Sequence, residues 1–338
     1  MALTPNNINT WNKAIDSYIK DELEQSPKSV YDMLFKVVTT DRLESTDVPY
    51  SGYNRMEEVS DLGDAVEDEV REGYPYAYRR RQFRKQSVFS SNLLQTDQIG
   101  EVETMARDLV RTQKTSRDLY AMSMFRRAWD TGQVFGDSKP LISTLHPLKD
   151  GSGTQSNTFS GGTQRPLTYE NAILLQDVLL DQISNSSNLL TGGDSNHNHL
   201  IVTGPENREA AFQAANPNGP TGQPDSTDNN LNYIKKGEKF DVLITKYFSY
   251  RAAFEMGETT VTKTASGNFY DDMWLLIDKN IFTKYAKMRI AETYPTFKEE
   301  TNLKNEALIR YVYDKYDWGS SGYLGLAGSK GDNTTYSS

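Results

Sequence analysis

The chain contains no cysteine among its 338 residues. This absence excludes disulfide bonds, thiolate metal ligands and cysteine nucleophiles, and it is compatible with synthesis in a cytoplasm. No apolar run approaches the ~18 to 20 residues that a membrane-spanning helix requires, so we expect no integral membrane segment. The first residues lack a basic stretch followed by an apolar core, so we also expect no secretory signal peptide.

The sequence also lacks the common motifs of catalysis. It has no Gly-x-Ser-x-Gly turn, no Gly-x-x-x-x-Gly-Lys-Ser/Thr loop, and no Gly-x-Gly-x-x-Gly after an expected strand. The sequence therefore indicates neither a hydrolase nucleophile nor a phosphate or dinucleotide loop. We predict no catalytic residue, no cofactor and no metal site, and we interpret the chain as a protein that is not an enzyme.

Histidine is scarce, with three copies. His197 and His199 flank an asparagine in a loop rich in Gly, Asn and Ser, where two ligands could meet a metal ion. The sequence positions no third ligand, so we interpret them as loop histidines and keep a metal-dependent hydrolase only as an alternative. His146 precedes Pro147 and suits a turn or a packing contact.

Acidic side chains outnumber basic ones, 46 to 37, which gives a net charge of -9. This balance argues against a general nucleic-acid binder, although a local basic patch stays possible. Tyrosine is abundant, at 20 copies. Aromatic side chains are enriched at protein–protein contacts, so the composition favours a protein that binds other proteins.

A single long helix is expected over Thr96–Gly132, a stretch without proline. Thr96 or Asp97 can cap its start and Gly132 can supply a left-handed stop. At ~1.5 Å per residue this helix would be roughly 50 Å long. The apolar stripe is interrupted by the polar residues Gln113–Ser116. The alternative is therefore a pair of core helices broken near Lys114.

The first 28 residues are predicted to form an arm that contains a short amphipathic helix. Trp11, Ile15 and Tyr18 fall on one face of this helix. The helix has little core of its own to cover, so two placements remain open. It can pack on its own domain or on another molecule.

An acidic limb, a turn and a basic limb follow. The acids are Glu57, Glu58, Asp61, Asp64, Glu67, Asp68, Glu69 and Glu72, against the single base Arg71. The bases are Arg79, Arg80, Arg81, Arg84 and Lys85. This order predicts an extended hairpin whose opposite charges face each other, laid across a neighbouring molecule. The alternative is a solvated charged loop.

The remaining pattern is a mixture of helices and strands, which predicts an α+β fold. Strands are expected at 30–40, 199–203, 240–245, 252–256, 273–277 and 307–315. Helices are expected at 167–183, capped by Thr168, and at 205–215, with a proline in the first turn. The residues 216–230 form a long stretch of turn formers.

Several segments, taken in order, resemble one protein family. GDSKPLISTLHPLKDGSGTQSN is similar to the "Pro-Leu-Phe-Ser-Thr-x-His-Pro" stretch and Gly/Ser/Asn loop of tailed-phage major capsid proteins, with Ile142 in place of the phenylalanine. LTYENAILLQDVLLDQ, HLIVTGPENREAAFQ, MWLLIDKN and IRYVYDKYDWG resemble the later helices, strands and closing Asp-x-Gly turn of that family. The resemblance covers roughly residues 30–325. It implies the Hong Kong 97-like capsid fold, which tailed phages share with herpesvirus shells and encapsulins.

The resemblance implies a division of the chain into the parts of that fold. These are an N-terminal arm (1–35), a peripheral-domain strand (36–50), an extended loop (51–90), a peripheral domain (91–165) with a spine helix (96–132), an axial domain (166–300), and a closing strand with the C-terminal tail (301–338). It implies intersubunit contacts by Trp11, Ile15 and Tyr18 of the arm, and by the charged extended loop. The loop residues are Glu67, Asp68, Glu69, Arg79, Arg80, Arg81, Arg84 and Lys85.

The function implied is that of a major capsid protein. Hexamers and pentamers of the chain would form an icosahedral shell that encloses double-stranded DNA, with non-specific DNA contacts and no membrane. The shell would be assembled in the host cytoplasm and become part of the virion. A separate scaffolding protein, a portal and decoration proteins are the implied partners. An encapsulin-like nanocompartment shell is the alternative within the fold. Lys85 lies where some relatives crosslink, but no partner for it is identifiable, so we predict no crosslink.

Overall fold

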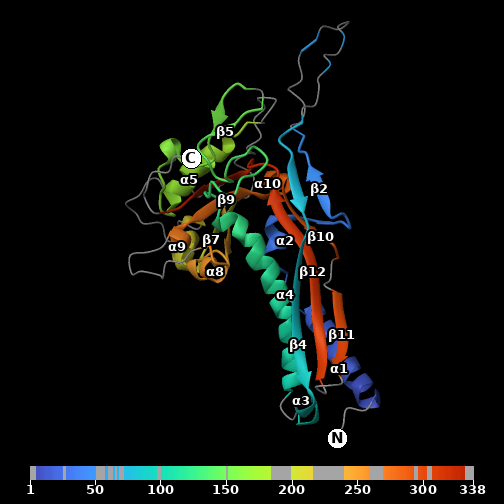
Figure 1. Cartoon of the computed structure of the whole chain (residues 1–338). Helices are drawn as coiled ribbons and strands as arrows, with labels where there is room; N and C mark the ends of the chain where they lie inside the picture. Colours follow the sequence, from blue (N-terminus) through green and yellow to red (C-terminus); the bar gives the residue numbers. More distant parts are fainter. Residues whose placement is uncertain are drawn as a thin grey trace.

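The computed structural model describes residues 5–25, 28–50, 58–59, 64, 67, 72–96, 100–149, 151–183, 199–215, 240–258, 269–292, 296–302 and 307–331. It is a mixed α+β structure with one long stalk and a broader upper part (Figure 1). In the stalk, α4 runs beside β4, β12 and β11, and α1 lies at the narrow end (Figure 1). The broader part carries a second sheet and most of the shorter helices.

The first sheet is built on β12 (Ala307–Ser320). β10 (Ala286–Ile290), β11 (Thr296–Asn302) and β4 (Arg81–Ser90) all pair with it in antiparallel fashion. β1 (Lys36–Thr39) joins the outer edge of β10 in parallel. The predicted strand at 307–315 is confirmed, but it continues to residue 320. The expected Asp-Trp-Gly turn is therefore wrong, because that segment stays in the ladder opposite β10.

The long helix is confirmed as one unbroken element, α4 (Glu101–Arg126), of 26 residues or about 39 Å. The predicted ends were wrong. Gly100, with φ of 74°, occupies the N-cap position in a left-handed conformation, and a separate short helix, α3 (Ser91–Thr96), precedes it. At the other end the chain turns at once, because Arg127 leaves helical geometry and its guanidinium binds Asp130.

The second sheet has the strand order β13 (Leu326–Ser329), β9 (Trp274–Asp278), β7 (His199–Thr203) and β8 (Phe240–Ile244). The predicted strands at 199–203, 240–245 and 273–277 are thus confirmed within a residue or so. On one face α5 (Tyr169–Leu180) and α6 (Arg208–Ala215) pack against Ile201, Trp274 and Leu276. Thr168 caps α5 as predicted, since its hydroxyl accepts from the backbone N–H of Asn171 at 3.2 Å. The short helix η2 (Pro205–Asn207) leads into α6.

Two strand predictions failed. The segment 252–256 lies in a helix, α8 (Tyr250–Glu255), because the Ser249 side chain caps its start by accepting from the N–H of Ala252. The segment 30–40 begins as a helical turn, α2 (Tyr31–Leu34), and only then becomes β1. Segment 30–40 is rich in β-branched and aromatic residues, but burial of Tyr31 and Leu34 favours a helical turn at its start. Segment 252–256 has no β-branched residue, and the Ser249 cap favours the helix there.

The remaining elements complete the body of the chain. They are α1 (Pro5–Gln25), β2 (Glu44–Asp47), β3 (Tyr76–Arg79), β5 (His146–Pro147), β6 (Thr154–Gln155), η1 (Ser160–Gly162), α9 (Phe269–Asp272) and α10 (Lys279–Tyr285). Within the described part of the chain, no helix is long and apolar enough to cross a membrane.

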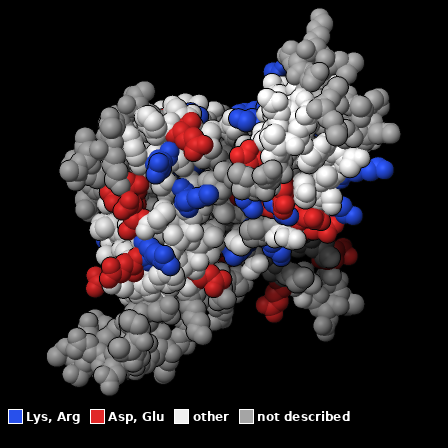
Figure 2. All heavy atoms as spheres, turned by 90° about the horizontal axis from the view of Figure 1, so that it is seen from below, with Lys and Arg blue, Asp and Glu red and all other residues white. Residues whose placement is uncertain are grey.

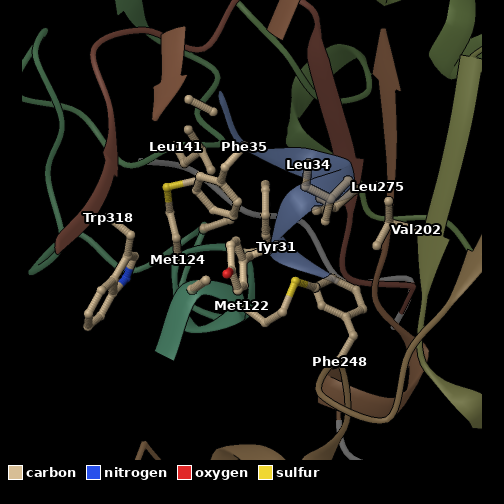
Figure 3. Close-up of a cluster of buried hydrophobic side chains, with 14 of the residues drawn as sticks. Tyr31, Leu34, Phe35, Met122, Met124, Leu141, Val202, Phe248, Leu275 and Trp318 are labelled. Carbon is tan, nitrogen blue, oxygen red and sulfur yellow. The ribbon is translucent and has the colours of Figure 1, made fainter. Parts of the chain in front are cut away.

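The largest hydrophobic core joins the two sheets. Met122 and Met124 of α4 belong to the same buried cluster as Phe35 of the α2–β1 turn, Val202 of β7, Leu275 of β9 and Trp318 of β12 (Figure 3). Because a single cluster contacts both sheets, the stalk and the broader part share buried apolar surface. The C-terminal half of α4 therefore fixes the position of the stalk relative to the broader part.

Candidate contact surfaces

The predicted extended loop begins from a two-stranded ribbon. β2 pairs with β3 in antiparallel register, with Asp47 opposite Tyr76. Beyond them Tyr50 bridges to Glu72, and the N–H of Gly73 donates to the carbonyl of Pro49 at 2.6 Å. The two ends of the segment 51–71 are therefore adjacent. Glu67 is exposed, whereas Asp68 and Glu69 lie outside the described residues.

Two contacts with the body hold the root of the ribbon. The Asp47 carboxylate accepts from the Lys287 ammonium, with both oxygens at 2.6 Å. The Asp317 carboxylate accepts from the backbone N–H of Arg79 at 2.8 Å. Burial raises the pKa of Asp317, although that hydrogen bond and the charge of Arg81 oppose the shift. The ribbon is thus fastened to β10 and β12 of its own chain.

Among the described residues, Arg79, Arg80 and Arg81 contact groups outside the acidic limb, which differs from the predicted charge pairing. The Arg79 side chain lies 3.4 Å from a carboxylate oxygen of Glu44, and Arg81 lies 3.6 Å from Asp317. Arg80 donates to the carbonyl of Asp41 at 3.1 Å. The reason is topological, because residue 79 ends β3 and residue 81 starts β4, a strand of the first sheet.

The last two bases of the limb, Arg84 and Lys85, are exposed on β4. Arg84 lies opposite Tyr313, and its guanidinium is centred 5.3 Å from that ring. Lys85 lies opposite Val312. Since β4 pairs with β12 from residue 81 to residue 90, this part of the expected loop belongs to the sheet.

The N-terminal helix packs on its own chain. Ile15 is completely buried in a cluster with Phe89, Val102 and Leu308, while Trp11 and Tyr18 are half-buried against the same cluster. Of the two placements left open by the sequence, the first is therefore the one observed. Ile15 is not available to a neighbour in this conformation.

An ion-pair network also holds the arm. The Glu22 carboxylate accepts from Arg111 at 2.9 Å and from Arg107 at 3.2 Å, both on α4. The hydrogen bond from Arg111 lowers the pKa of Glu22, against the opposing effect of burial. The arm is thereby fixed along α4.

The polar stretch Gln113–Ser116 was the place where the alternative interpretation put a break between two helices. Instead Gln113 and Arg117 are buried and both bind the Asp314 carboxylate of β12. Burial alone would lower the pKa of Arg117, but the hydrogen bonds and charge of Asp314 outweigh it and raise the pKa. Sequence reasoning missed this contact, since the i, i+4 spacing places Gln113 and Arg117 on one helix face but does not identify Asp314 as their partner.

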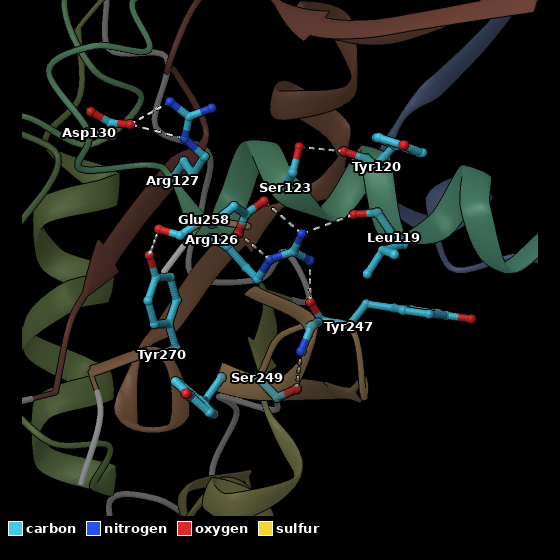
Figure 4. Close-up of polar contacts among 12 residues, drawn as sticks. Leu119, Tyr120, Ser123, Arg126, Arg127, Asp130, Tyr247, Ser249, Glu258 and Tyr270 are labelled. Carbon is cyan, nitrogen blue, oxygen red and sulfur yellow. Dashed lines mark hydrogen bonds and ion pairs between the residues drawn. The ribbon is translucent and has the colours of Figure 1, made fainter. Parts of the chain in front are cut away.

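A second buried arginine connects α4 to the broader part of the molecule. Arg126 is 1% exposed, and its guanidinium contacts both carboxylate oxygens of Glu258, at 2.7 and 2.9 Å (Figure 4). It also donates to the carbonyls of Tyr247 at 2.6 Å and Leu119 at 3.2 Å.

The histidines provide no metal centre in the part of the chain that is described. His197 lies outside the described residues, and His199 is buried in β7 with its Nδ1 3.2 Å from the Gln176 amide. No group of three metal-ligating side chains occurs among the described residues. His146 is buried, 2.5 Å from Asp137 and stacked on Tyr323, so it makes a packing contact.

Charges of both signs are mixed on the surface. Viewed from the narrow end, Lys and Arg alternate with Asp and Glu, and no single sign covers this face (Figure 2). A continuous track for nucleic acid requires a basic stripe on one face, which this view does not contain. The face seen in this view therefore shows no continuous basic track for sequence-independent phosphate binding.

No protein-family model matches the chain, and no curated protein matches it in sequence. Among solved structures, the chain is similar to one in the procapsid of bacteriophage JBD30, with a TM-score of 0.53 and 11% identity, over 97% of this chain and 76% of that one. It is also similar to a chain in the capsid of an empty GTA particle, with a TM-score of 0.50 and 10% identity, over 90% of each. The chain thus has the mixed α+β, Hong Kong 97-like fold of these capsid chains.

Proposed function

We propose that the chain is a major capsid protein that assembles through hexamers and pentamers into an icosahedral shell around double-stranded DNA of a tailed phage. The observation that carries the proposal is the fold, since the likeness to procapsid and capsid chains extends over at least 90% of this chain. The ribbon of β2 and β3 supports it, because the ribbon brings together the two ends of the charged segment 51–71.

The parts of the fold follow as part of this proposal. Residues 1–35 serve as the arm, 36–50 as a peripheral strand, 91–165 as the rest of the peripheral domain with the spine helix α4, 166–300 as the axial domain, and 301–338 as the closing strand and tail. The pairing of β4 with β12 moves residues 81–90 from the extended loop to the peripheral sheet. The extended loop then comprises the residues up to Arg80.

The proposed contacts with neighbouring subunits use charged groups of the loop and its root, and aromatic groups of the arm. They are Glu67, Asp68 and Glu69 in the loop, Arg79, Arg80 and Arg81 at its root, Arg84 and Lys85 on β4, and Trp11 and Tyr18 on the arm. A separate scaffolding protein, a portal and decoration proteins are the proposed partners, together with packaged DNA held by non-specific contacts. Stability of such an assembly is partly collective, because contacts between subunits bury surface in addition to the cores of each chain.

Expression of the chain, alone and together with the neighbouring genes, tests the proposal. Closed particles seen by electron microscopy and a fast-sedimenting species are the expected results. A chain that stays monomeric in every combination contradicts the proposal. The contents of the particles separate the two kinds of shell, because a nanocompartment encloses a cargo enzyme and a phage head encloses DNA.

A further inference from the structure

β12 turns alternate side chains to the two faces of the first sheet. On one face, Leu308 packs in the buried cluster with α1 and α4, and Asp314 binds Arg117 of α4. Because side chains alternate along a strand, Tyr313 and Lys315 point to the opposite face. This second face therefore carries an aromatic ring and a cation from β12.

The two strands that flank β12 add a cation each. β4, β12 and β11 lie side by side in the stalk (Figure 1). Arg84 of β4 lies opposite Tyr313, and its guanidinium is centred 5.3 Å from that ring. The Lys298 ammonium of β11 lies 5.5 Å from the same ring. With Lys315, three strands thus contribute one cation each to this part of the sheet.

These three cations line one hollow of about 460 Å³, together with Tyr313. The Arg84 guanidinium donates to the side-chain oxygen of Gln82 at 2.9 Å, which restrains its position. Its other N–H groups contact no acceptor among the described residues and are available to a ligand. A hollow shields a bound ion from part of the surrounding water, so the attraction of its cations is stronger than on a flat surface.

No carboxylate of the described chain neutralises the three cations. None of them forms an ion pair with an Asp or Glu of the residues that the structure describes. Asp314, which also lines the hollow, is bound to Arg117. Glu292 lines it as well and accepts from the Thr296 hydroxyl at 2.7 Å. Positive charge is thus in excess, and the hollow suits an anion.

We propose that this hollow binds a compact polyphosphate group, two or more linked phosphates on a small molecule. Its volume falls in the range of small-molecule sites, roughly 300–1,000 Å³. Linked phosphates place several negative charges close together. They can accept from the guanidinium fork of Arg84 and from the ammonium groups of Lys298 and Lys315 at the same time.

Carboxylates at both ends of the hollow favour a short ligand. Glu292 follows Ala291, whose N–H donates to the carbonyl of Lys315. Glu300 is two residues beyond Lys298 on β11, so it projects from the same face. A nucleic-acid strand would continue past these negative charges, whereas a compact ligand ends before it reaches them. The charges of the described residues therefore favour a small molecule over a nucleic acid.

Binding of tripolyphosphate to the full-length chain tests the proposal. Titration calorimetry at constant ionic strength should show saturable binding at one site per chain. The affinity should rise in the order orthophosphate, pyrophosphate, tripolyphosphate, because each added phosphate meets a further cation. Since the ligand binds the folded chain, the midpoint of thermal unfolding should also rise with its concentration. Sodium sulfate at the same ionic strength is the reference and should give a smaller rise.

Substitutions of the cations identify the site. Lys298→Gln with Lys315→Gln should weaken tripolyphosphate binding by about tenfold or more, because two charge-assisted contacts are lost. Arg84→Lys keeps the charge but loses the fork, so it should weaken binding by a smaller factor. Lys36→Gln with Lys284→Gln removes the same charge from exposed positions outside the hollow. This control should keep the affinity within about twofold, because salt screens charges away from the site.

Several results would overturn the proposal, and none of them depends on whether shells form. One is the absence of saturable binding by any of the three phosphates. Another is equal affinity in the unmodified chain and in the Lys298→Gln, Lys315→Gln variant. If that variant does not fold, as judged by circular dichroism, an unchanged affinity of Arg84→Lys would contradict the proposal instead. Tighter binding of a single-stranded oligonucleotide of about ten nucleotides, lost in the same variants, would assign the hollow to nucleic acid.

Discussion

Arg117 of α4 and Asp314 of β12 form a buried, two-point ion pair. The Nε and Nη2 atoms of Arg117 each lie 2.7 Å from a different carboxylate oxygen of Asp314. The two side chains are 4% and 6% exposed. Because one partner lies on α4 and the other on the central strand β12, the pair fixes the rotation of α4 about its axis and its position along β12.

Arg117→Met should destabilise the subunit by about 3–5 kcal/mol, because it leaves the Asp314 carboxylate buried without its cation. The midpoint of unfolding in guanidinium chloride measures the loss. The double change Arg117→Met with Asp314→Leu is the control, and it should recover most of the stability, because neither charge then remains. Equal losses in the single and double variants would contradict this account.

The sequence was sufficient to predict α4 as one helix but not to interpret its polar stretch. Periodicity reports which face of a helix is apolar, and Gln113 and Arg117 break that stripe. Their partner, Asp314, lies far away in the sequence, on a strand whose register depends on the whole sheet. A buried polar contact of this kind cannot be read from local pattern.

Asp118 should make stability depend on pH. Burial raises its pKa from 3.8 to about 6, against the opposing hydrogen bond from the Tyr31 N–H. A raised pKa means that the folded state favours the protonated form. This contribution is complete below the unfolded pKa and is lost as pH rises through about 6.

Asp118→Asn should therefore flatten the pH dependence of unfolding between pH 4 and pH 7. A shift of this size corresponds to about 3 kcal/mol. Asparagine can still accept from the Tyr31 N–H, so we expect the variant to be the more stable protein at pH 8. Unfolding midpoints measured across this range provide the test, with Asp108→Asn on the exposed side of α4 as the control. An unchanged slope for Asp118→Asn would refute the assignment.

Arg126 and its neighbour Arg127 offer a matched pair. Arg126→Lys removes the two-point contact with Glu258, and a lysine ammonium cannot also donate to the carbonyls of Tyr247 and Leu119. We therefore expect the free energy of unfolding to fall by about 3 kcal/mol or more. Arg127 binds Asp130 at the surface, with both side chains 40% exposed. Arg127→Lys should cost less than about 1 kcal/mol. Limited proteolysis should cut the Arg126→Lys variant faster near residue 258, and equal rates for the two variants would contradict the difference in burial.

The charged hairpin illustrates a different limit of sequence reasoning. The order of charges predicted two facing limbs, and Tyr50 and Glu72, at the two ends of the loop segment, do lie opposite each other. However, the strand that pairs with β3 is β2, which precedes the acidic run, and β4 pairs with β12. The pairing of strands depends on which side chains are buried, such as Tyr78 and Phe89, and on the register that buries them. The order of charges along the chain does not determine either of these.

The three arginines at the root of the ribbon should be needed for assembly but not for folding. Arg79 and Arg81 are largely exposed, so Arg79→Glu, Arg80→Glu and Arg81→Glu together should leave the circular dichroism spectrum unchanged. The new carboxylates would stand beside Glu44 and Asp317, so repulsion should tilt the ribbon away from its position on β12. Electron microscopy should then find folded subunits and no closed particles.

A charge-matched control separates this local effect from the change in net charge. Lys28, Lys36 and Lys284 are exposed and lie outside the ribbon, so changing all three to Glu alters the net charge by the same amount. Particles should still form from this control. Normal particles from the arginine variant would refute the role of the ribbon root. Loss of particles from both variants would mean that net charge, rather than the contacts of Arg79 and Arg81, limits assembly.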